Sequence, residues 1–339
     1  MPISRRQWFT ATAAGLSGAP GLLADERHGD PSWTPVGAEI ERAFEDLPGR
    51  KGLKVWAPRS GRAPEFSVAL HANKSLFSAS ANKSYILCER LRQLDSPRVE
   101  ENLENHEIKL DDSIWSPGST VFNPPDLSGL VSERTAMEAM TTHSDNTATD
   151  MVLKEATPKK VRQFLAAIGA KRTLIPDSTR ALAAYLFGAS NYLTITWDEL
   201  VAIANQSEGI LANPLLNDVE TFASSANDLV TFYARALQGE FFKNGETLQA
   251  FRRILSLGDI TSLVPFPLGI NAFGKAGYVD APGQHARCIA GGMYFPDRWV
   301  YFAMILNWDT AEVDDPGTIN AYFRAVRMAI QAVRDALGA

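Results

Sequence analysis

The sequence has few of the residues on which several classes of protein depend. Only 2 of its 339 residues are cysteine, which excludes a disulfide-dense scaffold and a four-cysteine zinc site. Its 5 histidines show no H-x-x-x-H spacing, and we expect neither a metal nor another cofactor. No run of 18 apolar residues occurs, so no stable membrane span is expected. Acidic side chains outnumber basic ones by 39 to 33 without any Lys/Arg block, which argues against nucleic acid as a partner.

Material for a buried core is abundant. Apolar residues make up 45% of the chain, and its 17 Phe, 7 Trp and 8 Tyr argue against disorder. The length suits one large domain or two modest ones. We therefore expect a soluble, acidic, globular monomer.

The first 24 residues resemble a bacterial export signal of the twin-arginine type. Arg5 and Arg6 precede Trp8 and Phe9, and a mildly apolar stretch then runs to Ala24, where we expect cleavage. Such signals carry folded cargo. Residues 25–339 would then form the mature domain, located in the periplasm or secreted.

Hydrophobic periodicity predicts strands near both ends of the chain and helices between them. The predicted strands are 53–57, 66–71, 273–279, 286–294 and 299–307, and the predicted helices are 35–47, 80–94, 133–140, 147–155, 158–168, 227–238, 246–257 and 318–337. Residues 170–222 are less regular. This order predicts a three-layer α+β fold, with an antiparallel sheet flanked by the N- and C-terminal helices. An all-α lobe of about 80–222 would be inserted in a sheet lobe of about 33–79 and 223–339.

The first motif that carries chemistry is S-x-x-K, formed by Ser80-Ala81-Asn82-Lys83 at the start of a predicted helix. Side chains three positions apart share a helix face, so the Lys83 amine can reach the Ser80 hydroxyl. Serine is a weak nucleophile unless a base takes its proton, and a desolvated lysine can be that base.

Two further motifs are weak when taken alone. Ser144-Asp145-Asn146 lies between two predicted helices, where Asp145 could simply cap the second one. Lys275-Ala276-Gly277 lies on a predicted strand, where a surface lysine is the ordinary interpretation.

Taken in this order, the three motifs resemble those of class A β-lactamases and penicillin-binding proteins. The resemblance covers about residues 33–337. Ser144-Asp145-Asn146-Thr147-Ala148 is similar to the family's S-D-N-T-A, and Ala286-Arg287-Cys288-Ile289-Ala290 is similar to its next strand, which carries an arginine. The resemblance implies a β-lactamase/transpeptidase-like fold and a serine hydrolase that opens a β-lactam or a D-Ala-D-Ala-like substrate, with antibiotic resistance as one role.

The resemblance also implies roles for the catalytic residues. Ser80 would attack the carbonyl and become acylated, and Lys83 would accept its proton. Ser144, helped by Lys275, would relay a proton to the leaving nitrogen. Asn146 would hold Lys83 and the substrate amide.

The remaining implied residues bind the substrate. Gly277 and Tyr278 would lie along it, with the N–H groups of Ser80 and Tyr278 forming the oxyanion hole. Arg287 would bind the substrate carboxylate with its guanidinium fork, unless it is an ordinary exposed strand arginine.

The sequence departs from the family pattern at two places. Ala276 replaces a hydroxyl residue that contacts the substrate carboxylate in the family. The glutamate that activates the deacylating water is missing, because residues 156–198 contain no Glu. Thr221–Leu229 resembles the family's T-T-P-x-x-M, so the intervening ω region is enlarged. The candidate replacement bases are Asp177, Glu199, Glu208 and Glu220, of which Glu199 is better explained as a solvated charge at a helix start.

These departures leave the function open among three alternatives. The first is β-lactamase activity. The second is a D,D-peptidase, penicillin-binding or esterase-type enzyme with slow deacylation, and the third is an acylating sensor or inactive relative.

Cys88 and Cys288 could form a disulfide or remain buried thiols, and His143 is interpreted as structural.

Overall fold

The computed structural model describes residues 34–337 apart from 62–63, 265, 267–268 and 296–297. The predicted export signal at residues 1–24 lies outside the described residues. Within the described part of the chain, no helix is both long enough and apolar enough to cross a membrane.

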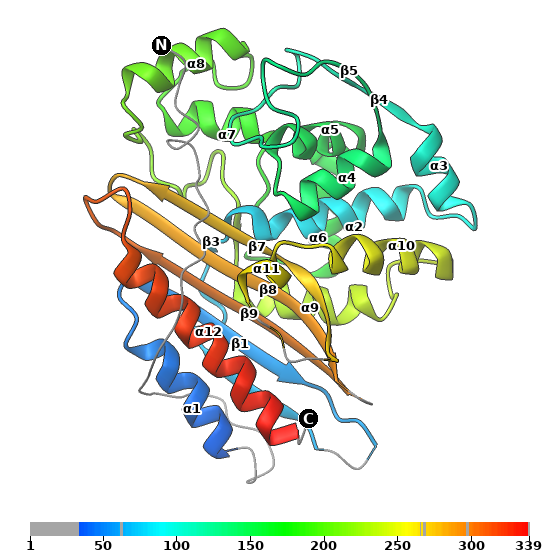
Figure 1. Cartoon of the computed structure of the whole chain (residues 1–339), viewed down its shortest axis with the longest axis vertical. Coiled ribbons are helices and arrows are strands. Elements are labelled where there is room, and N and C mark those ends of the chain that lie inside the picture. The colour runs from blue at the N-terminus through cyan, green and yellow to red at the C-terminus, as the bar shows by residue number, and fades with distance from the viewer. Residues whose placement is uncertain (1–33, 62–63, 265, 267–268, 296–297, 338–339) are drawn as a thin grey trace.

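A five-stranded antiparallel sheet organises the fold, with strand order β2-β1-β9-β8-β7 (Figure 1). The strands are β1 (Arg50–Ala57), β2 (Phe66–Leu70), β7 (Asn271–Ala281), β8 (Gln284–Phe295) and β9 (Arg298–Trp308). Pairing of β1 with β9 joins the N-terminal strands to the C-terminal ones. All five lie where the sequence predicts strands, and the α+β prediction is confirmed.

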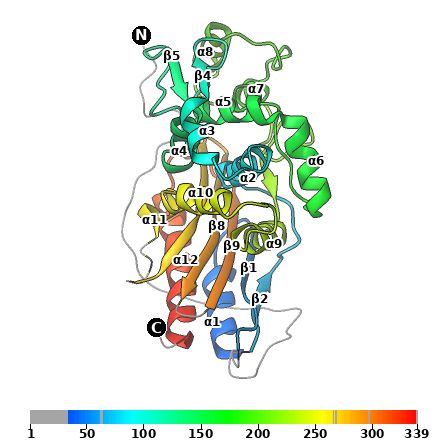
Figure 2. The same cartoon turned by 90° about the vertical axis from the view of Figure 1, so that its right-hand side faces the viewer.

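Helices cover both faces of this sheet. On one face, α1 (Thr34–Glu45) and α12 (Pro316–Leu337) lie side by side and bury an apolar core (Figure 1). On the other face lie α2 (Lys83–Gln93), α9 (Ala226–Leu237) and α10 (Gly245–Ser256), as Figure 2 shows for α9 and α10. Successive side chains of a strand point to opposite faces, so each strand contributes to both cores.

The middle of the chain is helical, as predicted. Its helices are α3 (Val99–Asn105), α4 (Glu133–Thr142), α5 (Asn146–Ala156), α6 (Pro158–Ile168), α7 (Thr179–Leu186) and α8 (Trp197–Gln206), and two small antiparallel pairs are formed by β4 (Glu107–Leu110) with β5 (Gly129–Ser132) and β3 (Leu76–Phe77) with β6 (Ala223–Ser224). The short helix α11 (Ile260–Leu263) precedes β7. Helix α7 lies in the region for which no regular element is predicted.

Helix α7 forms because its first turn is fixed from outside. The Ser178 side chain caps it by accepting the Ala181 N–H. The buried Asp150 carboxylate of α5 accepts the N–H groups of Thr179 at 2.6 Å and Arg180 at 3.0 Å. These tertiary contacts stabilise a helix that is too short to be stable alone. Hydrophobic periodicity in the sequence does not reveal such contacts.

A side-chain clamp holds β3 against the main sheet. The Asn307 side chain of β9 accepts the Phe77 N–H at 2.9 Å and donates to the Phe77 carbonyl at 2.8 Å. Asn307 is only 3% exposed, so water does not compete for these groups. The clamp fixes the chain three residues before Ser80.

We expect Asn307→Ala to lower the free energy of unfolding by about 2–4 kcal/mol, because two buried backbone groups of Phe77 lose their partner. Urea denaturation measures the change. Asn205→Ala, at an exposed position of α8, is the control and should stay close to the wild-type stability. Equal effects of the two substitutions would show that the clamp does not stabilise the fold.

Candidate active site

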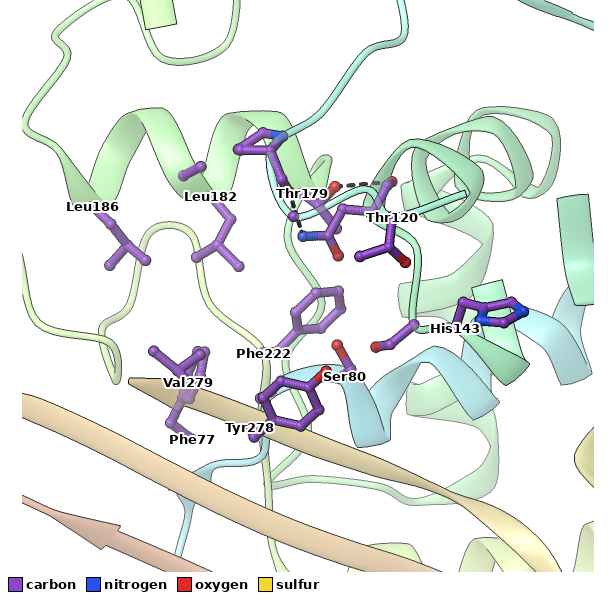
Figure 3. A pocket seen from close by; sticks show the side chains of 16 residues that line it. Phe77, Ser80, Thr120, His143, Thr179, Leu182, Leu186, Phe222, Tyr278 and Val279 are labelled. Carbon is purple, nitrogen blue, oxygen red and sulfur yellow. Dashed lines mark hydrogen bonds between the residues drawn. The ribbon is translucent and has the colours of Figure 1, made fainter. Parts of the chain in front are cut away.

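Ser80 lies on a short 3-10 turn, η2 (Ala79–Asn82), between β3 and α2. Ala79, just before it, has φ of 49°, a left-handed conformation that costs energy in a residue with a side chain. The buried Asn82 side chain secures the turn: it donates to the Ala223 carbonyl at 2.8 Å and accepts from the Ser78 hydroxyl at 2.8 Å. The turn presents half-buried Ser80 to a pocket (Figure 3).

Lys83 is the first residue of α2, three positions after Ser80, and only 1% exposed. Its ammonium donates to the Asn146 side-chain oxygen at 2.7 Å and the Ser144 carbonyl at 2.6 Å, with the Ser144 hydroxyl at 3.4 Å. Burial, and then the positive charge of Lys275, lower the pKa of Lys83 to about 7. Lys83 can therefore lose its proton and become a neutral amine near neutral pH.

The loop that carries Ser144 is fixed by Asp145. This buried carboxylate caps α5 by accepting the Ala148 N–H at 2.8 Å, so it is a helix cap. It also accepts the N–H groups of Val121 at 2.8 Å and Phe122 at 3.0 Å. One carboxylate thus joins the loop of Ser144 to the loop that contains Val121 and Phe122, which borders the pocket. The Asn146 amide adds a bond of 2.6 Å to the Pro117 carbonyl.

Lys275 on β7 is buried rather than a surface lysine. Its ammonium forms an ion pair with Asp259, whose other oxygen accepts the Ala276 N–H at 2.8 Å. Burial lowers the pKa of Lys275, and the Asp259 charge opposes that effect. Sequence reasoning did not identify Asp259, which no motif marks.

Gly277 allows β7 to lie directly against the turn that bears Ser80. A Cβ atom built on Gly277 would lie 2.3 Å from the Ser78 carbonyl oxygen and 2.7 Å from the Ser80 nitrogen. Both atoms belong to the backbone and cannot move aside, so only glycine fits here. The next residue, Tyr278, lines the same pocket as Ser80.

Of the predicted site residues, Ser80, Ser144, Asn146 and Tyr278 line the pocket, whereas Arg287 does not. It is 6% exposed, and its guanidinium donates to Asp280 at 2.8 Å and to the Val279 carbonyl at 3.2 Å. It also lies 5.9 Å from the centre of the Tyr278 ring and 5.5 Å from that of Trp308. Arg287 is therefore neither an exposed strand arginine nor part of the pocket lining.

The four candidate bases also lie outside the pocket lining. Asp177 and Glu208 are exposed, and Glu199 closes a capping box with Thr196 at the start of α8, as expected for a helix-start charge. Glu220 is buried, which raises its pKa to about 7, but its carboxylate accepts the Asp177 N–H at 2.8 Å. Among the described residues that line the pocket, none is Asp or Glu.

The pocket has a polar and an apolar end. Thr120, Ser144 and Asn146 contribute to the polar end. The apolar side chains are Phe77, Leu182, Ala183, Leu186, Phe222 and Val279, three of them from the unpredicted helix α7. His143 borders the pocket, but its ring points away from Ser80 (Figure 3).

Cys88 and Cys288 are both free and buried.

Comparison with known proteins supports the resemblance. Residues 36–328 match the sequence profile described as the beta-lactamase enzyme family. The structure of PBP-A has a TM-score of 0.64 and 18% identity, covering 89% of this chain and 97% of that one. A beta-lactamase from Sphaerobacter thermophilus DSM 20745 has a TM-score of 0.64 and 17% identity, covering 90% and 98%. A class A representative from Bacteroides cellulosilyticus DSM 14838 has a TM-score of 0.64 and 14% identity, covering 90% and 98%.

No curated protein sequence matches the chain. The structural similarities lie below 20% identity, so they show the fold and not the substrate. With the profile match they confirm the family resemblance that the three motifs predict.

We expect Gly277→Ala to slow labelling of Ser80 by a fluorophosphonate at least tenfold, because the added methyl group displaces β7 from the turn η2 that bears Ser80. Gly245→Ala is the matched control. It opens α10 with no atom within 4 Å of the new methyl group, so labelling should be unchanged. Unaltered labelling of Gly277→Ala would contradict the close contact.

The pH dependence of the same labelling tests the state of Lys83. The rate should rise with pH through about 7, as Lys83 loses its proton and becomes able to accept that of Ser80. Lys275→Met should move this rise to higher pH. It removes a positive charge that lowers the pKa of Lys83 and leaves Asp259, whose charge raises it. Lys154→Met, at an exposed site, is the control, and a rise unmoved in Lys275→Met would contradict the coupling.

Proposed function

Because the chain belongs to the beta-lactamase enzyme family, we propose that it is a serine hydrolase in which Ser80 is acylated by β-lactam amides. One observation carries this proposal. Lys83, buried and with its pKa lowered to about 7, lies one turn from Ser80 and is bonded to Ser144 and Asn146. A neutral amine in this place can take the proton that serine must lose.

The acylation step follows from these neighbours. The Ser80 oxygen attacks the lactam carbonyl and its proton passes to Lys83. The Ser144 hydroxyl, which lies 3.4 Å from the Lys83 nitrogen, hands its proton to the leaving nitrogen as the ring opens and receives the proton of Lys83 in its place. The N–H groups of Ser80 and Tyr278 stabilise the oxyanion, and Gly277 supports this role by allowing the two backbones to meet. Ser80 and Lys83 share no hydrogen bond among the described residues, and such contacts commonly tighten when substrate binds.

We propose that deacylation is slower than acylation, as in a penicillin-binding protein. The water that releases the acyl group needs a base, and the described pocket lining contains no carboxylate. Lys83 is the remaining group that can activate water there. A related structure, with 17% identity and a TM-score of 0.60, is a PBP-A mutant captured as an acyl-enzyme complex with penicillin G.

We also propose that the enzyme is exported by the twin-arginine route. Residues 1–24 would be removed, and residues 25–339 would act as one catalytic domain. Arg5 and Arg6 before the apolar stretch support this proposal.

Intact mass spectrometry during incubation with penicillin G tests the proposed function. Ring opening loses no atoms, so the protein should gain the mass of a whole penicillin molecule. This adduct should persist after free penicillin is removed. Lys83→Met should slow its formation about 10²–10⁴-fold, because serine loses its base.

Ser80→Ala is the control and should give no adduct. Neither adduct nor penicillin hydrolysis in the wild type would overturn the proposal. Rapid hydrolysis without a persistent adduct would keep Ser80 as nucleophile but contradict slow deacylation. An adduct that is never released would favour the acylating sensor.

A further inference from the structure

We propose that the substrate class that fits this site best is a neutral carboxylic ester with a short apolar acyl group, of about three or four carbons. This inference rests on the proposed acylation of Ser80 and adds a second class of acyl donor to the β-lactam amides.

The apolar end of the pocket provides the first argument. Its six apolar side chains are each only 2–8% exposed. Leu182 and Leu186 are four residues apart on α7, so they share one helix face. Figure 3 shows Leu182, Leu186 and Val279 on one side of Ser80, and Thr120 and His143 on the other. A wall of this kind favours an alkyl group and leaves a polar group without partners.

The direction of proton transfer decides which part of the substrate meets this wall. The proton must return to the leaving atom, and Ser144 with Lys83 lies on the route. The leaving atom therefore faces the polar end, where Ser144 and Asn146 lie. The acyl substituent, on the other side of the carbonyl carbon, then points to Leu182 and Leu186.

The distribution of charge argues for a neutral substrate. Lys275 is paired with Asp259, and Arg287 is paired with Asp280 outside the pocket lining. The His143 ring points away from Ser80. Lys83 lies at the Ser144 end of the site. Beside the apolar wall, none of the described residues therefore offers a substrate carboxylate a free positive charge. A carboxylate on the acyl side of the substrate, against this wall, would lose hydration without compensation.

The size of the pocket limits the length of the acyl group. The whole pocket, with its polar end included, has a volume of about 70 Å³, about half of the 150 Å³ cavity that holds one benzene molecule. Half of a six-carbon ring corresponds to about three carbon atoms. Propionyl and butyryl groups fit this volume, whereas an octanoyl group has to extend out of it.

The reaction balances without any group that the site lacks. The Ser80 oxygen forms a bond to the ester carbon, the C–O bond of the ester breaks, and the Ser80 proton leaves with the alcohol. Water then adds to the acyl carbon, the bond to Ser80 breaks, and the carboxylic acid is released.

Rates of p-nitrophenyl ester hydrolysis test the proposal. The butyrate should exceed the acetate in kcat/KM about 15-fold, because each buried methylene contributes about fourfold. The octanoate should be slower than the butyrate. The p-nitrophenyl monoester of succinic acid, which carries a carboxylate at the end of a four-carbon acyl group, should be at least 100-fold slower than the butyrate.

Variants of α7 connect this preference to the pocket. Leu182→Ala enlarges the cavity and should shift the best substrate from butyrate towards hexanoate. Leu186→Phe fills it and should lower the rate for butyrate more than for acetate. Leu193→Ala, at a leucine that is 59% exposed outside the pocket, is the matched control and should keep the wild-type order of esters. Fluorophosphonate labelling of Ser80 checks that each variant is folded.

The outcomes separate the two proposals. Ester hydrolysis that survives in Ser80→Ala would overturn this inference, whereas the penicillin adduct decides the proposed function. If Ser80 is labelled and forms the penicillin adduct, but chain length has no effect or the succinate ester reacts as fast as the butyrate, this inference fails and the proposed function stands. The inference would also be overturned if Leu182→Ala left the ranking of the esters by kcat/KM unchanged.

Discussion

Burial of the Lys83 side chain is the constraint on which the rest of the site depends. An exposed lysine would keep its proton at neutral pH, and one paired with a carboxylate would keep it more firmly. Lys83 instead donates hydrogen bonds only to uncharged oxygens, those of Ser144 and Asn146. The neighbouring Asp145 carboxylate is directed to backbone N–H groups, and Asp259 is bound to Lys275. Burial and the Lys275 charge bring the pKa of Lys83 to about 7, and no carboxylate bonded directly to Lys83 cancels their effect.

Keeping such a lysine dry requires three distant parts of the chain to meet closely, and each junction depends on one residue. The Asn307 side chain of β9 holds β3 against the main sheet, and with it the start of the turn η2 that bears Ser80. Gly277 removes the side chain that would keep β7 away from this turn. Asp145 ties the loop of Ser144 to the loop beside it. None of the three needs to touch a substrate, yet the position of Lys83 relative to Ser80 follows from all of them.

The sequence was sufficient to predict what depends on local patterns. Periodicity located the five sheet strands and the long helices. The spacing of Ser80 and Lys83 on one helix turn supports the proposal that they are the nucleophile and its base. Features that depend on tertiary contacts were beyond its reach. Helix α7 is short and is held by Asp150, and Asp259 belongs to no motif. Arg287 was expected to bind substrate, but its guanidinium is bonded to Asp280 two residues beyond its cross-strand partner Tyr278.

The segment between Ser144 and Thr221, which the family resemblance predicts to be enlarged, gives the pocket much of its apolar wall in the region where the sequence suggested a base. Leu182 and Leu186 contact the pocket, while Asp177 and Glu220 are held outside its lining. A dry wall strengthens the electrostatic contacts that stabilise an oxyanion, which speeds attack by Ser80. In the proposed mechanism, the same wall would keep water away from the acyl group on one side and would slow its release. Because kcat/KM includes only the steps up to acylation, the preference imposed by the wall should appear there. The value of kcat should instead be set by the deacylation that Lys83 has to support, and should vary less from one acyl group to the next.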